Sequence, residues 1–295
     1  MTTTTKIPIK TKIPIKTKLD KKIIAAPMTG VSNAKLACAV DSAGGLASLQ
    51  YYNDIFDETY DPFIYLEQQL DEFYMSQGHN NLIVSHGNIE RLYGKGAHKK
   101  ILDICDNFGV TYIESLYSPH TVNPDPRFQW IQRSPLPDET TGFHTNSNAD
   151  YLMFKTPKAA GAGGNANNLT LPNTKQPVIL SGGVYDKTDV DYYLSLGAIA
   201  VEVGTVFAAS KESCLSDATK QSIIDKGLKD LGRFTSDNRQ GLNIQDYDDK
   251  GFNHMHSLLK GINDPTQGHI YAGEAIERIT EILPVAEIMR RLTCE

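Results

Sequence analysis

The stretch Pro177–Phe207, PVILSGGVYDKTDVDYYLSLGAIAVEVGTVF, has the pattern of a complete strand–helix–strand unit. Its apolar run 177–180 suits a strand that is buried on both faces, and a second such run follows at 198–203. Between the two runs, Asp186 is placed to cap a helix, and Gly197 is placed to end it. The stretch therefore predicts two parallel strands joined by a helix.

A glycine-bearing corner follows each of these strands, namely Ser181-Gly182-Gly183 and Gly204-Thr205. In a parallel sheet both corners lie at the carboxyl ends of their strands. Backbone N–H groups exposed at such corners bind anions, most often phosphate. Glycines of this kind can also serve only to make tight turns. Two corners on consecutive strands favour the phosphate interpretation.

The same layout recurs along the chain. Six further apolar runs suit strands, at residues 23–27, 46–49, 81–85, 111–115, 128–132 and 150–154. Helix patterns at 33–43, 62–74 and 97–108 separate the first four of these runs. Eight strands of this kind predict an α/β fold of the TIM (β/α)8 type. A doubly wound parallel sheet is the alternative architecture.

Three segments depart from the repeat. The polar stretch 134–148 contains two prolines, so we expect the fifth helix of the barrel to be irregular or missing. Residues 213–270 form a small helical excursion beside the barrel mouth in this interpretation. Residues 1–19 carry five lysines and no acidic residue, which predicts a flexible basic arm. The barrel then comprises 20–212 and 271–295, and a closing helix at 274–292 is kinked or restarted at Pro284.

Composition narrows the classes of function. The net charge of the 295-residue chain is −6, and no basic patch points to nucleic acid. No apolar run reaches the ~18–20 residues of a membrane span. The four cysteines are scattered, which indicates free thiols in a reducing compartment, and we expect the cytoplasm. Two pairs have metal-like spacing, His86 with Glu90 and His254 with His256, but neither has an evident third ligand, so we predict no metal.

A set of motifs stands in a fixed order: IIAAPMTGVS at 23–32, AGGLASL at 43–49, KAAGAGGNA at 158–166, PVILSGGV at 177–184 and GAIAVEVGTVF at 197–207. GRFTSDNRQGL at 232–242 and YAGEAIERITEILPVAEIMRRL at 271–292 follow. Together they resemble the nitronate monooxygenase (2-nitropropane dioxygenase) family of FMN-dependent barrels. The resemblance covers roughly residues 20–292 and is weak between 50 and 150.

The resemblance implies that FMN lies across the barrel mouth, with its phosphate at the two glycine corners. It also implies a segment that lines the flavin ring and a glycine-rich loop beside it. The cofactor-binding residues expected on this basis are Ala26, Pro27, Met28, Gln50, Gly161, Gly163, Gly164, Ser181, Gly182, Gly183, Gly204, Thr205 and Gly273.

One position departs from the family pattern. Active relatives usually have Ala-Gly-Gly-His in the glycine-rich loop, whereas this chain has Asn165 in place of the histidine. An amide can form hydrogen bonds but cannot accept a proton near neutral pH. The candidates for catalysis are therefore Asn165 itself, with His120 and His144 as possible replacements for the base.

The resemblance implies an oxidoreductase that oxidises alkyl nitronates, a small-molecule substrate, with molecular oxygen. A flavin-dependent NAD(P)H-linked reductase of enones or enoyl thioesters is a second interpretation from the same fold. A flavin-binding relative with little catalysis, suggested by Asn165, is the third. We also expect a homodimer to cover the flank that a missing fifth helix would leave open.

Overall fold

A sheet of eight parallel strands forms the centre of the structure, a computed structural model that describes residues 19–51, 59–87, 89–116, 124–136, 148–164, 169–233, 239–242 and 252–294. The strand order is β1-β9-β8-β6-β5-β4-β3-β2. The strands are β1 (Ile23–Ala25), β2 (Ser48–Leu49), β3 (Ile83–His86), β4 (Tyr112–Leu116), β5 (Gln129–Pro135), β6 (Tyr151–Lys155), β8 (Val178–Ser181) and β9 (Ala200–Val203).

The two end strands of this sheet, β1 and β2, lie next to one another, so the sheet closes into a barrel. A parallel bridge joins Ile24 of β1 to Leu46, two residues before β2. The Ala25 amide donates to the Leu46 carbonyl over 2.9 Å, and the Leu46 amide donates to the Ile23 carbonyl over 2.8 Å. The (β/α)8 prediction is therefore confirmed, and the alternative of an open, doubly wound sheet is wrong.

Alternate residues of each strand point to opposite sides of the sheet, because side chains alternate along a strand. One set packs together as the barrel interior: Leu19, Ile24, Leu46, Ile83, Tyr112, Ile131, Tyr151, Met153, Ile179 and Ala200. The other set, which includes Val84, Leu180 and Val201, packs outward with the helices. The apolar runs of the sequence are continuous because both faces are covered.

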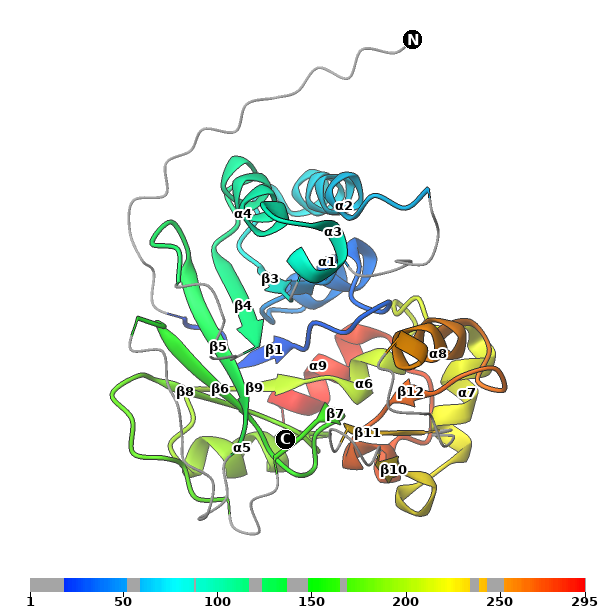
Figure 1. Cartoon of the computed structure of the whole chain (residues 1–295). Coiled ribbons are helices and arrows are strands. Elements are labelled where there is room, and N and C mark those ends of the chain that lie inside the picture. The colour runs from blue at the N-terminus through cyan, green and yellow to red at the C-terminus, as the bar shows by residue number, and fades with distance from the viewer. Residues whose placement is uncertain are drawn as a thin grey trace.

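Helices cover the outside of the barrel (Figure 1). They are α1 (Ala34–Ser42), α2 (Pro62–Gln77), α3 (Glu90–Tyr93), α4 (Ala97–Asn107), α5 (Lys187–Ser195) and α9 (Val285–Thr293). The short α6 (Thr205–Ala208) follows β9 at the barrel mouth. Asn33, Asp61 and Asp186 cap α1, α2 and α5 through their side chains. The predicted capping role of Asp186 is confirmed, and its side chain forms a full capping box with Asp189.

The excursion packs beside the barrel mouth and contains α7 (Asp217–Asp225) and α8 (Phe252–Asn263). It also contains a small antiparallel sheet of β10 (Gly232–Arg233), β11 (Arg239–Leu242) and β12 (Ile270–Tyr271). From the barrel, β7 (Gly161–Ala162) pairs with β11. The glycine-rich loop after β6 is therefore tied to the excursion by a strand, which its sequence did not predict.

Two segments differ from the expected helices. The predicted closing helix is divided into a 3₁₀ turn, η2 (Glu274–Arg278), and α9, with Pro284 at the N-cap of α9. Proline has no N–H to continue a helix, so it starts a new one here. In the segment 134–148, Ser134 and Pro135 extend β5 by pairing with Phe154 and Lys155. Residues 137–147, where the fifth helix would lie, are outside the described residues.

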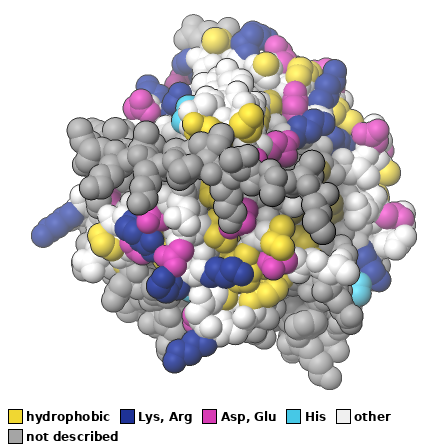
Figure 2. Space-filling model, turned by 90° about the horizontal axis from the view of Figure 1, so that it is seen from above, with side chains coloured by type: hydrophobic (Ala, Val, Ile, Leu, Met, Phe, Trp, Pro, Cys, Tyr) yellow, Lys and Arg dark blue, Asp and Glu magenta, His cyan; other side chains and the backbone are white. Residues whose placement is uncertain are grey.

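The surface shows no segregation of charge on the face seen from above. Figure 2 shows Lys and Arg interspersed with Asp and Glu across the described part of this face. Among the described residues, no helix combines the length and the apolar character that crossing a membrane requires.

Candidate active site

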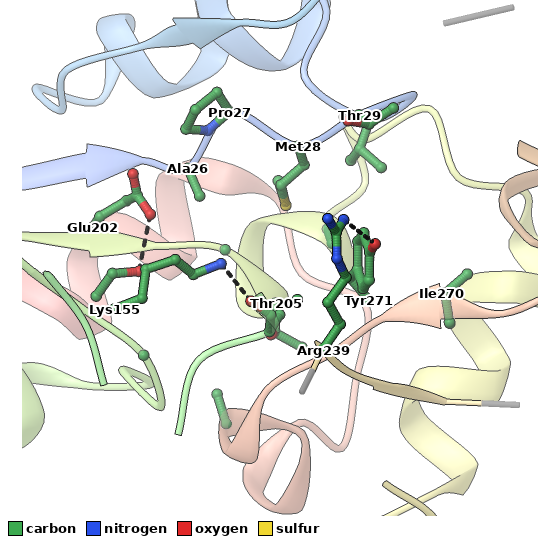
Figure 3. A pocket seen from close by; sticks show the side chains of 18 of the residues that line it. Ala26, Pro27, Met28, Thr29, Lys155, Glu202, Thr205, Arg239, Ile270 and Tyr271 are labelled. Carbon is green, nitrogen blue, oxygen red and sulfur yellow. Dashed lines mark hydrogen bonds between the residues drawn. The ribbon is translucent and has the colours of Figure 1, made fainter. Parts of the chain in front are cut away.

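A cavity opens at the carboxyl ends of the barrel strands, the end at which TIM barrels carry their active sites. The barrel supplies Ala26, Pro27, Met28, Gln50, Arg133, Ser134, Lys155, Ser181, Gly182, Gly183, Glu202, Gly204 and Thr205 to its wall. The excursion supplies Leu215, Arg239, Leu258, Ile262 and Ile270, and Tyr271 follows directly after it. Figure 3 shows the two groups facing one another across the cavity, with the Ala26–Thr29 segment above them.

The corner after β8 has a backbone that only glycine adopts without strain. Gly182 has φ +127° and Gly183 has φ +71°. A Cβ on Gly182 would lie 2.4 Å from Thr156 Oγ1 and 2.7 Å from the Ala159 amide nitrogen. Both the dihedral angle and the close approach of the β6 loop therefore require glycine at this position.

Side chains from α5 and η2 hold this corner in place. The Tyr193 hydroxyl donates to the Gly182 carbonyl over 2.5 Å, and burial raises the pKa of Tyr193 to about 12. Arg278 forms ion pairs with Asp186 and Asp189, the capping residues of α5. The corner is therefore fixed by contacts outside the cavity, and its backbone faces the cavity.

The corner after β9 lies beside the first. The Thr205 hydroxyl accepts a hydrogen bond from the Gly273 amide over 3.0 Å. A Cβ on Gly204 would lie 3.4 Å from the Ala26 Cβ. Within the described residues, the N–H groups of Gly182, Gly183 and Thr205 donate no hydrogen bond. Two neighbouring corners thus present unpaired backbone donors at one end of the cavity.

The Ala26-Pro27-Met28 segment leaves β1 along the cavity edge. The hydroxyl of Ser32, which is buried, accepts from the Met28 amide and donates to the Ala26 carbonyl, both over 2.9 Å. Asn33, and not Ser32, caps α1. Ser32 therefore shapes the segment that the family resemblance assigns to the flavin ring.

Three of the expected glycines do not line the cavity. Cβ atoms on Gly163, Gly164 and Gly273 would lie 2.9, 2.6 and 2.5 Å from backbone carbonyl oxygens of neighbouring segments. These glycines let backbone segments pack closely around the β6 loop. Gly161 does line the cavity, as do Gln50 and the other eight residues expected to bind the cofactor.

Charged side chains from three strands, those of Arg133, Lys155 and Glu202, form the floor of the cavity. Arg133 of β5 pairs with Glu114 of β4 over 3.1 Å. The Ser181 hydroxyl donates to Glu202 over 2.9 Å. Burial raises the pKa of Glu114 to about 8 and lowers that of Lys155 to about 8. Sequence reasoning named Ser181 but missed the four charged residues, although each falls at or next to the carboxyl end of a predicted strand.

The candidate catalytic residues Asn165, His120 and His144 lie outside the described residues. His86 does not line the cavity: it contacts the Tyr51 hydroxyl over 3.2 Å and His98 of α4. His269 is buried against Ser257. Within the described part of the chain, no group of three or more His, Cys, Asp or Glu side chains is arranged to hold a metal ion.

The second part of the chain matches a known protein family. Residues 169–295 match the family model described as nitronate monooxygenase. A curated protein of Rhodococcus jostii (strain RHA1), (3aS,4S,5R,7aS)-5-hydroxy-7a-methyl-1-oxo-octahydro-1H-indene-4-carboxyl-CoA dehydrogenase, is 32% identical over 87 residues. This match covers 28% of the chain and only 25% of that relative's length.

Solved structures share the whole fold at low sequence identity. FabK from Thermotoga maritima has a TM-score of 0.73 at 19% identity, over 92% of this chain and 91% of its own. A nitroalkane oxidase from Streptomyces ansochromogenes has a TM-score of 0.67 at 18% identity, over 92% and 94% of the two chains. The chain therefore shares its overall fold with these proteins.

Proposed function

The chain belongs to the nitronate monooxygenase family, whose model its residues 169–295 match, and on this premise we propose that it binds FMN and oxidises alkyl nitronates with molecular oxygen. The observation that carries the proposal is that the N–H groups of Gly182, Gly183 and Thr205 donate to none of the described residues. Such donors, at adjacent strand ends of a barrel, suit a phosphate dianion.

The remaining residues of the cavity fit a flavin. Ala26, Pro27 and Met28 offer a rigid edge for a planar ring, because Ser32 fixes their backbone. Gln50 and Arg133 add polar groups at the cavity wall. When bound, FMN would supply a two-electron acceptor, and the protein would orient the substrate and restrict water.

An anionic substrate suits the charge of this cavity. Among the described residues that line it, three side chains are cationic, Arg133, Lys155 and Arg239, and one is a carboxylate, that of Glu202. A nitronate already carries the negative charge and needs no base for its formation. We therefore expect nitronates to be better substrates than neutral nitroalkanes at neutral pH.

Oxygen uptake by purified protein supplied with ethyl nitronate tests the proposal. We expect uptake that depends on bound flavin and exceeds uptake with nitroethane at pH 7. Faster turnover of nitroethane than of its nitronate would contradict the stated preference.

A second candidate function is the reduction of an enone or enoyl thioester by NAD(P)H. It is favoured by the apolar wall of Leu215, Leu258 and Ile262, which could contact a hydrocarbon substrate. NADPH oxidation that depends on an enoyl thioester would support this function over the first. If flavin-loaded protein did neither reaction, it would be a flavin-binding relative with little catalysis.

A further inference from the structure

Lys155 is an amine at the floor of the cavity without a carboxylate partner in the described part of the chain. Its Nζ donates to the Ala160 carbonyl over 2.5 Å, and it forms no ion pair with any described carboxylate. Gly161 leaves space beside the amine, because a Cβ at this position would lie 3.6 Å from Nζ. Figure 3 shows the Lys155 side chain extending along the cavity toward Thr205.

The charged groups around Lys155 come from four elements. Arg133 of β5 and Arg239 of β11 are cationic, whereas Glu114 of β4 and Glu202 of β9 are acidic. The acids have nearer partners, since Glu114 pairs with Arg133 and Glu202 accepts from Ser181. Burial first, and then the Arg133 charge, lowers the pKa of Lys155 to about 8, although Glu202 and Glu114 oppose this. The lowered pKa increases the share of the neutral amine near neutral pH.

The backbone places Lys155 beside the loop that differs from the family pattern. The Lys155 carbonyl accepts hydrogen bonds from the Leu136 and Gly164 amides, both over 2.8 Å. The loop that leaves β6 after Lys155 thus returns to the same residue at Gly164. Asn165, at the position where the resemblance expects a histidine base, is the next residue in the chain.

We propose that Lys155 is the proton acceptor of this site and removes the α-proton of a neutral nitroalkane. The inference rests on the proposed function and extends its substrate class from nitronates to nitroalkanes. The C–H bond breaks, the proton forms a new N–H bond on Nζ, and the electron pair moves into the nitro group to give the nitronate. No oxidant takes part in this step. The resulting ammonium group, with Arg133 and Arg239 nearby, stabilises the anion.

Substitution of Lys155 tests the proposal through the ratio of two activities. We compare kcat/KM for nitroethane with kcat/KM for ethyl nitronate in the wild type, Lys155→Met and Lys155→Arg. Removal of a general base should lower the ratio about 100-fold or more in both variants. Arginine keeps the charge but stays protonated, so a Lys155→Arg variant with the wild-type ratio would overturn the proposal. Lys175→Met, an exposed lysine in the loop before β8, is the matched control and should leave the ratio unchanged.

The pH dependence gives a second criterion. The neutral amine is the active form, so kcat/KM for nitroethane should rise with pH through about 8 and then level off. The same parameter for the pre-formed nitronate should lack this rise. A nitroethane profile that is flat between pH 6.5 and 9.5 would overturn the proposal.

Two measurements do not depend on oxidation. Nitroethane in D₂O exchanges its α-hydrogen when a base removes it, and NMR follows this exchange with or without turnover of the flavin. We expect exchange above the Lys155→Met background. Reductive ¹³C-methylation should also give one lysine signal that is absent from Lys155→Arg and titrates near pH 8.

These measurements distinguish the proposed oxidation of nitronates from the proposed role of Lys155 as a base. Exchange without oxidation of either substrate would contradict the proposed function and support the base. Oxidation of nitronate by a protein that neither exchanges nitroethane nor shows a lysine titrating near 8 would overturn the base alone.

Discussion

The Tyr193 hydroxyl of α5 donates a hydrogen bond to the carbonyl oxygen of Gly182, in the corner after β8. Tyr193 is buried, so this bond lies in the interior of the protein. We expect Tyr193→Phe to lower the free energy of unfolding by about 1–3 kcal/mol, because the Gly182 carbonyl loses its partner. It should also weaken FMN binding. Tyr192→Phe is the matched control, since Tyr192 is the exposed neighbour. Urea unfolding and flavin fluorescence titration measure both effects, and equal behaviour of the two variants would contradict the role of Tyr193.

Gly109 is a control for substitution of Gly183 in the corner after β8. The two glycines have nearly equal φ angles, +69° and +71°, so alanine causes similar backbone strain at either position. Alanine at either position should cost about 1–2 kcal/mol of stability for the left-handed conformation. A Cβ at Gly183 would also lie 2.9 Å from the Lys158 Cβ, whereas none of the neighbouring atoms lies within 4 Å of a Cβ at Gly109. We expect Gly183→Ala to weaken FMN binding at least about tenfold, or 1.4 kcal/mol, and Gly109→Ala to leave it unchanged. Calorimetric titration with FMN would refute this if both variants bound equally.

Ser32 bridges the two ends of the Ala26–Met28 segment through one hydroxyl. Ser32→Ala leaves a backbone donor and an acceptor without this partner and should lower the free energy of unfolding by about 1–3 kcal/mol. Ser42→Ala is the control, because Ser42 is exposed and its change should stay within about 0.5 kcal/mol. Denaturant unfolding of both variants is the measurement, and a Ser32→Ala variant as stable as Ser42→Ala would show that the bridge contributes little.

His86 should make the protein sensitive to acid. Burial, and then the neighbouring His98, lowers the pKa of His86 to about 3. The unfolded chain binds a proton at this residue near pH 6.5, and the folded chain does not until near pH 3. The free energy of unfolding therefore rises with pH across this window, and the stability is lost as the pH falls from 6.5 toward 3.

The contribution of His86 can be measured as a change in the slope of the free energy of unfolding against pH. His86→Gln keeps an acceptor for the Tyr51 hydroxyl but cannot take up a proton. Its unfolding free energy should fall less steeply between pH 6 and pH 4, by up to about 1.4 kcal/mol per pH unit. His256→Gln, the same change at an exposed histidine, is the comparison variant. Parallel slopes for wild type and His86→Gln would exclude His86 as the acid-sensitive group.

The barrel could be predicted from sequence because its strands are buried on both faces and end at glycine corners. The runs at 177–180 and 198–203 became β8 and β9 almost residue for residue. The closing helix was harder to predict. Ile276 and Ile279 fit one face of a helix, but their segment is a 3₁₀ turn followed by extended backbone. Burial against the barrel imposes that apolar pattern whatever the local backbone, and Pro284 then sets where α9 begins.

The cavity could be predicted only in part. Glycine corners can be recognised from a few adjacent residues. Gly182, Gly183 and Gly204 were predicted in this way, and all three line the cavity. Lys155 and Arg133 were missed because each follows a predicted strand by one residue. Their inward direction depends on the alternation within β5 and β6, which is fixed by pairing with distant strands. Arg239 and Tyr271 were missed because they reach the cavity through the small sheet of the excursion.

The visible absorption spectrum of the purified protein tests the central claim most directly. FMN held at the Gly182, Gly183 and Thr205 corners should give a yellow protein with bands near ~370 and ~450 nm, the general expectation for an oxidised flavin. Protein purified without colour should recover these bands when it is mixed with FMN and desalted. A colourless protein that retains no FMN after this treatment would contradict the account.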